Sequence, residues 1–266
     1  MRRAMLGLDH LTEAQARSIH TLAFDLDDTL LDHGLLGERA YAALFRLRET
    51  GLKLVACTGR PAGWAEIILR QWPIDLAIAE NGAVAWRRDE SGRARFWDPS
   101  PPPERAERRG RLLALRDQIM VAHPELGLAD DNSARVTDIT FDIGEHRLVD
   151  APIVQRAQAL ASAAGVHTFA SSVHLHITLD DVDKASGFVA ACAARGSDPA
   201  KLLAHSGFVG DSTNDEAAFA SFGITFAVAN VARYLHLLRT PPRFVAKAEM
   251  GAGFAEIAEA IVAKRR

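Results

Sequence analysis

Two aspartates separated by one residue follow a short apolar segment near the start of the chain. Asp25 and Asp27 come directly after Thr21–Phe24, which we predict to be a β-strand. Residues two apart on extended backbone project to the same side, so the two carboxylates lie near each other while Leu26 points into the core. Neighbouring carboxylates repel, which favours a bound divalent cation or a proton that one of them can donate. A capped acidic turn before Thr29 is the alternative interpretation.

A threonine, a glycine and an arginine follow a second apolar segment. Thr58, Gly59 and Arg60 come after the predicted strand Leu52–Ala56. Pro61 then opens a helix. A hydroxyl group, a glycine that lets the backbone come close, free N–H groups at a helix start and a guanidinium together form a site that binds an anion such as phosphate. The alternative is a simple helix cap by the threonine.

A lysine and a second acidic segment lie in the last third of the chain. Lys184 would neutralise negative charge on a nucleophile and on a phosphoryl group. Asp211, in the segment Gly210–Asp215, would supply an oxygen ligand to an octahedral ion such as Mg²⁺. The alternatives are a solvated surface lysine and a capped turn, with Asn214 and Asp215 favoured in the first turn by the helix dipole.

These residues must be positioned by strands that alternate with helices. The segments that predict strands are short apolar runs, at residues 21–24, 52–56, 76–79, 208–209, 224–228 and 244–245. Helices are expected at residues 38–49 and after Pro61, and a capping box of Thr12 and Gln15 predicts a short helix over residues 12–19. The expected fold class is therefore α/β, with a doubly wound parallel sheet of Rossmann-like type.

The alternation is interrupted in the middle of the chain by a segment of different character. Its predicted elements are a hairpin over 84–97, an alternating strand over 136–143, a helix from Pro152 to Gly165 and a strand over 173–179. We therefore expect a separate α/β domain inserted into the core. The expected units are an N-terminal extension over residues 1–20, a core over residues 21–82 and 182–266, and the inserted domain over residues 83–181.

The composition excludes several classes of partner. The formal net charge is −3, so no overall positive field would attract nucleic acid or an acidic membrane surface. The two cysteines, Cys57 and Cys192, have no metal-binding or redox spacing and indicate a reducing compartment. Because no apolar stretch is long enough for a signal peptide or a membrane span, we expect a cytoplasmic protein.

The combination of motifs resembles the haloacid dehalogenase superfamily of phosphatases. The four motifs occur in order, each at the end of an expected strand or the start of a helix: Phe24–Leu30, Thr58–Arg60, Lys184 and Gly210–Asp215. The position of the insertion, together with Glu80–Ala83 and Phe226–Asn230, resembles the Cof-like branch, which has an α/β cap domain.

The resemblance implies a Mg²⁺-dependent phosphomonoester hydrolase that forms an aspartyl-phosphate. Asp25 would be the nucleophile and Asp27 the proton donor. Thr58, Gly59, Arg60 and Lys184 would bind phosphate. Asp25, Asp211 and the backbone carbonyl of Asp27 would bind the metal, with Asn214 and Asp215 orienting these ligands or the lysine. A phosphomutase that passes the phosphoryl group to a sugar is the alternative, and a non-catalytic module that binds phosphorylated ligands is a third.

The inserted domain, as the cap, would contact the leaving group of a small phosphorylated metabolite. On the strand 173–179, His174 and His176 share one face. Asp138 and Thr140 share a face of the earlier strand. These four residues are the candidate substrate contacts, and such a polar face favours a hydroxyl-rich group such as a sugar phosphate. A zinc site at the two histidines is less favoured, because no third ligand is evident.

Overall fold

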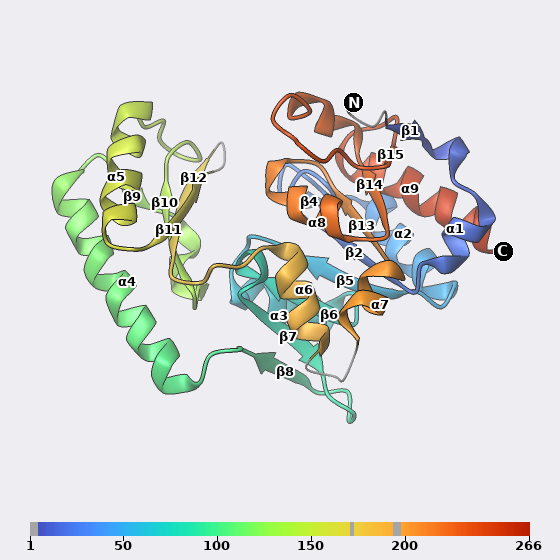
Figure 1. The fold of residues 1–266 in the computed structure, drawn as a ribbon, viewed down its shortest axis with the longest axis horizontal. Coiled ribbons are helices and arrows are strands. Elements are labelled where there is room, and N and C mark those ends of the chain that lie inside the picture. Colours follow the sequence, from blue (N-terminus) through green and yellow to red (C-terminus); the bar gives the residue numbers. More distant parts are fainter. Residues whose placement is uncertain (1–4, 171–172, 194–197) are drawn as a thin grey trace.

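The structure is a computed structural model and describes residues 5–170, 173–193 and 198–266. The described residues form a large sheet, a smaller sheet and a short two-stranded hairpin. Figure 1 shows the smaller sheet and its helices set to one side of the large sheet, joined to it by the segments that enter and leave the insertion. The residues 1–4 of the expected extension lie outside the described part of the chain.

The large sheet contains nine of the described strands: β1 (Leu6–Gly7), β2 (Thr21–Phe24), β5 (Lys53–Cys57), β6 (Leu76–Ala79), β7 (Val84–Arg88), β8 (Ala94–Trp97), β13 (Ser206–Gly210), β14 (Ile224–Ala227) and β15 (Phe244–Val245). Their order is β1-β15-β14-β13-β2-β5-β6-β7-β8. The pairs from β1 to β6 are parallel, and the last two pairs are antiparallel. Because β2 lies between β13 and β5, the segments that follow these three strands meet at one edge.

The described α-helices are α1 (Glu13–Ser18), α2 (Glu38–Glu49), α3 (Ala62–Gln71), α4 (Pro102–Ala122), α5 (Ala151–Ala163), α6 (Lys184–Ala193), α7 (Pro199–Ala204), α8 (Glu216–Ser221) and α9 (Met250–Arg265). Helices α1, α2, α3 and α9 bury their apolar side chains with one face of the large sheet. Helices α6 and α8 do so on the other face. The expected doubly wound α/β fold is therefore confirmed.

The two ends of the core sheet differ from the sequence-based expectation. Strand β1 pairs with β15, so the segment expected to be a mere extension supplies an edge strand. The hairpin of β7 and β8 was assigned to the insertion, but it continues the large sheet next to β6. The predicted helix at the start is confirmed, since the Thr12 hydroxyl caps α1 and Gln15 completes the capping box. The edge strands were missed because both depend on tertiary pairing.

The smaller sheet consists of β9 (Gly127–Leu128), β10 (Asp138–Asp142), β11 (His167–Ala170) and β12 (His174–Thr178), in the order β11-β12-β10-β9. On β12, Leu175 and Ile177 point into a core shared with α4 and α5. Phe141 on β10 joins the same core. The predicted alternation is thus confirmed, and the polar side chains of both strands are left on the opposite face.

Helix α6 begins where two glycines let the backbone pack at close range. A Cβ atom on Gly187 would lie 2.3 Å from the Cα of Gly82. Gly82 lies in the short helix η2 (Glu80–Gly82) and has a φ of +116°. Since Lys184 is the first residue of α6, this contact determines how deeply the lysine enters the core.

We predict that Gly187→Ala lowers the free energy of unfolding by about 1–3 kcal/mol, because the added methyl group has no space. Gly110→Ala is the matched control: Gly110 also lies inside a helix, but a Cβ there meets nothing within 4 Å. That variant should gain about 0.5–1 kcal/mol from helix propensity. Urea unfolding of both variants measures the difference. Equal stability of Gly187→Ala and wild type would contradict the close approach.

Candidate active site

The sequence-predicted motif residues meet at the carboxyl edge of the three central strands. Asp25 directly follows β2, and its N–H donates to the carbonyl of Val209 on β13. Thr58 follows β5, and Asp211 follows β13. All three side chains are buried. Open parallel sheets bind their ligands at this edge, so these residues form a candidate active site.

Lys184 connects two of the buried carboxylates. Its Nζ lies 2.9 Å from Oδ1 of Asp25 and 2.6 Å from Oδ1 of Asp215. The lysine is completely buried, so it is not a solvated surface charge. Burial alone would lower the pKa of Lys184, but the two aspartates outweigh burial and raise it. The lysine is therefore a permanent cation beside Asp25.

Asp215 contacts both Lys184 and the loop that follows β13. Its Oδ2 accepts hydrogen bonds from the N–H groups of Asp211 and Ser212, at 2.9 and 3.2 Å. Gly210 makes room for this carboxylate, since a Cβ atom there would lie 2.3 Å from Oδ2. Asn214, the other predicted orienting residue, is exposed, and its Oδ1 accepts from the Ser212 hydroxyl. The structure thus separates the two residues that were expected to act together.

Asp211 is oriented by two residues to which the sequence reasoning gave no role. Its Oδ1 accepts from the Thr29 hydroxyl at 3.0 Å, and its Oδ2 accepts from Nδ2 of Asn230 at 2.9 Å. Asn230 also donates to the backbone carbonyl of Asp28 at 2.9 Å. Thr29 and Asn230 lie within Phe24–Leu30 and Phe226–Asn230, two segments that carry the family resemblance, and that was the available signal for their participation.

The buried carboxylates repel one another strongly. Burial raises the pKa of Asp25 to about 7; Lys184 opposes this rise, and Asp215 and Asp27 add to it. Burial, with Asp215 and Asp25, likewise raises the pKa of Asp211 to about 8. One lysine does not offset this much negative charge, so the site favours a further cation.

The oxygen atoms of this cluster fit a hard divalent ion. Carboxylate oxygens of Asp25, Asp211 and Asp215 lie within 4.8 Å of one another. Asp215 already binds Lys184 and two backbone N–H groups, so Asp25 and Asp211 are the carboxylates best able to take a metal. Mg²⁺ is bound in proteins by one or two carboxylates with further oxygen ligands, which matches this donor set.

Asp27, the second aspartate of the first motif, contacts the loop Thr58–Arg60, which is called the phosphate loop below because the sequence predicts phosphate binding there. The Asp27 carboxylate accepts from Nε of Arg60 at 2.9 and 3.0 Å, and its side chain is 48% exposed. The guanidinium of Arg60 also stacks on the Trp64 ring, 4.1 Å from its centroid. Arg60 is therefore held between an anion and an aromatic ring, and it in turn positions Asp27.

The loop Thr58–Gly59–Arg60 is bound to the turn that follows β6. The N–H of Glu80 donates to the carbonyl of Arg60, and the N–H of Asn81 donates to the carbonyl of Thr58, both at 3.0 Å. Glu80 and Asn81 have φ values of 50° and 56°, a conformation that costs energy in residues other than glycine. A Cβ on Gly59 would lie 3.1 Å from the Asn81 side chain, so a larger residue there would press against Asn81.

Glu80 also binds the insertion to the core. Its buried carboxylate accepts from the N–H groups of Ala62, Val136 and Thr137, at 3.0, 2.9 and 2.6 Å. Beside it, Arg135 of the insertion donates to the carbonyl of Gly59 at 3.1 Å. The sequence analysis named Glu80 only within the segment Glu80–Ala83 and did not single out Arg135, because a buried carboxylate that accepts backbone N–H groups has no motif.

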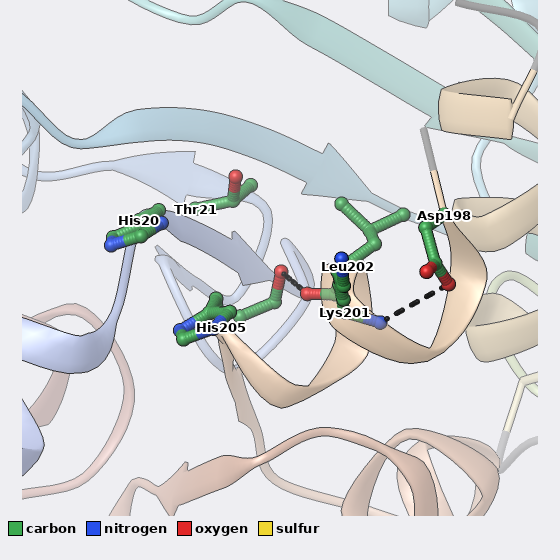
Figure 2. Close-up of a pocket in the computed structure, with 7 residues that line it drawn as sticks. His20, Thr21, Asp198, Lys201, Leu202 and His205 are labelled. Carbon is green, nitrogen blue, oxygen red and sulfur yellow. Dashed lines mark hydrogen bonds between the residues drawn. The ribbon is translucent and has the colours of Figure 1, made fainter. Parts of the chain in front are cut away.

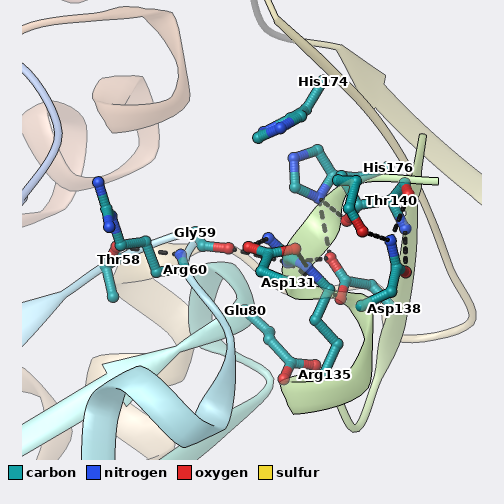
Figure 3. Close-up of polar contacts among 12 residues, drawn as sticks. Thr58, Gly59, Arg60, Glu80, Asp131, Arg135, Asp138, Thr140, His174 and His176 are labelled. Atoms are coloured by element: carbon teal, nitrogen blue, oxygen red, sulfur yellow. Dashed lines mark hydrogen bonds and ion pairs between the residues drawn. The ribbon is translucent and has the colours of Figure 1, made fainter. Parts of the chain in front are cut away.

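Three of the four candidate substrate contacts of the cap sheet form one hydrogen-bonded group, and Figure 3 shows all four on the face toward the Thr58–Arg60 loop. His176 Nδ1 lies 2.8 Å from Oδ2 of Asp138 and 3.0 Å from the Thr140 hydroxyl oxygen. Asp138 and Thr140 are buried behind the histidine. His174 meets the His176 ring edge-on and contacts Glu145 at 2.7 Å. The two histidines are therefore the outermost of the four side chains.

A separate pocket lies at the opposite edge of the large sheet. Figure 2 shows its lining, in which the rings of His20 and His205 stack with centroids 4.8 Å apart. The pocket has a volume of about 250 Å³, and Thr21 and Ser206, the first residues of β2 and β13, contribute to it. It thus lies at the amino ends of the strands, away from the motif residues.

Comparisons with known proteins agree with this fold. Residues 22–105 match the family model described as haloacid dehalogenase-like hydrolase. The phosphoglycolate phosphatase of Haloarcula marismortui is 27% identical over 213 residues, which cover 79% of this chain and 84% of that protein. A crystal structure of a Thermoplasma acidophilum protein has a TM-score of 0.71 at 18% identity, covering 91% of this chain and 98% of the other. The sucrose-phosphatase of Synechocystis has a TM-score of 0.64 at 18% identity, covering 91% and 97%.

Residues 22–105 therefore resemble the haloacid dehalogenase-like hydrolases, and the chain has the fold of the solved structures named above. The chain is an enzyme of the phosphatase class. Across the described residues, no helix is long and apolar enough to cross a membrane.

The raised pKa values predict how pH and Mg²⁺ affect stability. Asp25 and Asp211 hold their protons more tightly in the folded state, so their contribution to stability is present below about pH 4 and is lost as pH rises to about 8. In EDTA, the free energy of unfolding should therefore fall across this range. Mg²⁺ at about a hundredfold its Kd should add about 2.7 kcal/mol at pH 8.

Urea unfolding at pH 5 and pH 8 measures both effects. Asp211→Asn should flatten the pH dependence and reduce the gain from Mg²⁺. Asp117→Asn, whose side chain is 65% exposed, is the control and should behave as wild type. If Asp211→Asn retained the wild-type pH dependence and the full gain from Mg²⁺, the assignment of Asp211 to the metal site would be wrong.

Proposed function

We propose that this phosphatase is a Mg²⁺-dependent phosphomonoester hydrolase that works through an aspartyl-phosphate on Asp25. The observation that carries the proposal is the buried contact between Lys184 and Asp25, at 2.9 Å, beside the loop that starts with Thr58. A carboxylate paired with a buried cation at an anion-binding edge is suited to attack phosphorus, because the lysine offsets the charge of both reacting groups.

One carboxylate oxygen of Asp25 is bound by neighbouring groups, and the other is available to attack phosphorus. Its Oδ1 accepts from the N–H of Leu26 at 2.8 Å and contacts Lys184. We assign Oδ2 to in-line attack on phosphorus, with Lys184 and the Thr58 hydroxyl binding the phosphoryl oxygens. The Thr58 oxygen accepts from the N–H of Arg60 at 3.0 Å, so its own proton is directed elsewhere.

Asp27 is the proposed acid and base. Its half-exposed carboxyl group lies two residues from the nucleophile, where it can reach the oxygen that leaves phosphorus. It protonates that oxygen when the ester bond breaks and then takes a proton from the water that hydrolyses the aspartyl-phosphate. Arg60 holds Asp27 by its ion pair and contributes a second cation to the phosphate loop.

Mg²⁺ would be held by the carboxylates of Asp25 and Asp211 and by the backbone carbonyl of Asp27. When bound, the ion neutralises charge on the phosphoryl group and on the carboxylates. Asp215 would act through Lys184, and Thr29 and Asn230 through Asp211. This assignment is supported by the proximity of the carboxylate oxygens and by the raised pKa values of Asp25 and Asp211.

The proposed substrate is a small phosphorylated metabolite, with a sugar phosphate as the leading class. The polar face of the smaller sheet, on the side of the phosphate loop, supports this choice. We propose the core as residues 21–82 and 182–266 with the β7–β8 hairpin added, and the remainder of the insertion as the substrate-recognising cap. The Haloarcula relative makes 2-phosphoglycolate a necessary member of any substrate panel.

We predict that Asp25→Asn abolishes phosphate release from every member of a phosphometabolite panel assayed with Mg²⁺. Asp27→Asn should lower kcat by roughly 10²- to 10⁴-fold, because it removes the acid and base but leaves the nucleophile. Asp28→Asn is the matched control, since the neighbouring Asp28 side chain is 47% exposed and asparagine tolerates its φ of 55°. It should keep wild-type activity.

Two outcomes would contradict this assignment. Asp25→Asn with more than trace activity would exclude Asp25 as nucleophile, and wild type inactive on the whole panel would exclude the proposed hydrolase. Repeating the assay on sugar monophosphates with a bisphosphate activator tests the phosphomutase. Isomerisation faster than phosphate release would favour that alternative.

A further inference from the structure

His176 in the cap sheet has a hydrogen-bonding role that its neighbours define. Its Nδ1 faces the Asp138 carboxylate at 2.8 Å and the Thr140 hydroxyl oxygen at 3.0 Å. A carboxylate can only accept, so the imidazole proton is assigned to Nδ1. In the neutral ring, Nε2 then carries the lone pair and can only accept a hydrogen bond.

Asp138 is held as a carboxylate by a buried arginine. Arg135 donates from one nitrogen to both Asp138 oxygens, at 3.2 and 3.0 Å. Burial alone would raise the pKa of Asp138, but Arg135 and His176 outweigh burial and hold it below its usual value. The same nitrogen of Arg135 donates to the carbonyl of Gly59 at 3.1 Å. A continuous chain of contacts therefore runs from the phosphate loop to the imidazole.

The free nitrogen of His176 points out of the cap sheet. Figure 3 shows the His176 and His174 rings on the side toward the Thr58–Arg60 loop. The residue is only 6% exposed, and the ring of Phe169 stacks on it with centroids 4.4 Å apart. Within the described ranges, every hydrogen bond of His176 is made by Nδ1. Nε2 is not among the described buried atoms that lack a partner, so it is a solvent-accessible acceptor that a ligand can reach.

The charge state agrees with this geometry. Burial lowers the pKa of His176 below its usual value, and Asp138 opposes the change without reversing it. Since an unperturbed histidine titrates near pH 6.5, the ring is neutral at pH 7.5. The neighbouring His174 ring meets it edge-on at 5.9 Å and is paired with Glu145.

We propose that Nε2 of His176 accepts a hydrogen bond from a hydroxyl group on the leaving group, so that the enzyme selects hydroxylated phosphomonoesters over carboxylated ones. The inference rests on the proposed hydrolase function and assigns a substrate class to the same site. His176 is the specificity-determining residue, and Asp138 and Arg135 are positioning residues that fix which nitrogen carries the proton.

The charges around His176 also disfavour a carboxylated leaving group. A carboxylate offers only acceptors, and it would meet the Nε2 lone pair without a proton between them. Glu145 adds negative charge beside His174. The Arg135 guanidinium is taken by Asp138 and Asp131, and that of Arg60 by Asp27. A hydroxyl group is the better match because it can donate to Nε2.

Three small substrates isolate the contribution of this one group. They are 2-hydroxyethyl phosphate, 2-phosphoglycolate and ethyl phosphate, in which the second carbon is a hydroxymethyl, a carboxylate or a methyl group. At pH 7.5 with Mg²⁺, wild type should show a kcat/KM for 2-hydroxyethyl phosphate about tenfold above that for ethyl phosphate. The value for 2-phosphoglycolate should be the lowest of the three.

The variants separate the acceptor from a general packing effect. His176→Phe keeps a ring beside Phe169 but removes Nε2, and should abolish the tenfold preference while retaining turnover of ethyl phosphate. His176→Gln keeps an oxygen acceptor and should retain part of the preference. Asp138→Asn lets the proton move to Nε2, and should raise KM for 2-hydroxyethyl phosphate and lower it for 2-phosphoglycolate. His146→Gln, with a side chain 60% exposed on the same insertion, is the control and should match wild type.

The outcomes distinguish this inference from the proposed function. If wild type hydrolyses these esters but His176→Phe keeps the wild-type ratio between 2-hydroxyethyl phosphate and ethyl phosphate, the role of His176 is overturned. A wild-type preference for 2-phosphoglycolate would overturn the substrate class. If wild type hydrolyses none of the three and no other phosphomonoester, the proposed function itself fails. Circular dichroism of each variant confirms that a lost preference is not lost folding.

Discussion

The buried contact of Lys184 with Asp25 and Asp215 is the interaction on which the rest of the structure depends. Removing three charged groups from water is costly, and the cost is met only because each charge has a partner at 2.6–2.9 Å. The close packing of Gly187 on Gly82 places the start of α6 deep enough for this contact. The remaining negative charge raises the pKa values of Asp25 and Asp211 and creates the requirement for a cation.

The sheet topology determines which residues can join this centre. Because β2 lies between β13 and β5, Asp25, the proposed nucleophile, is flanked by the proposed metal-binding loop after β13 and by the proposed phosphate loop after β5. The phosphate loop is in turn bound to the insertion through Glu80 and Arg135. The proposed phosphate loop and the proposed leaving-group contact are thus joined by one chain of contacts, which runs from Gly59 through Arg135 and Asp138 to His176.

Much of the core could be predicted from the sequence, because its elements are encoded locally. Helix α2 has the predicted bounds, and the strand before Asp25 does too, since apolar runs and turn residues define both. The edge strand β1 and the position of β7 could not be predicted, because short strands at a sheet edge are determined by their neighbours. The roles of Arg135, Glu80 and Asn230 were missed for a similar reason. Their contacts with Gly59, Thr137 and Asp211 join residues that lie 76, 57 and 19 positions apart in the chain.

The central claim is that the phosphoryl group passes through Asp25, and mass spectrometry of the quenched enzyme tests it directly. The enzyme is mixed with Mg²⁺ and a substrate that it hydrolyses, and the reaction is stopped with acid within one turnover. The protein is then digested. The account predicts that the peptide containing Asp25 gains the mass of one phosphoryl group, and that this species accumulates further in Asp27→Asn, in which its hydrolysis is slower. Phosphate release at the normal rate with the label on another residue, or on none in either protein, would contradict the account.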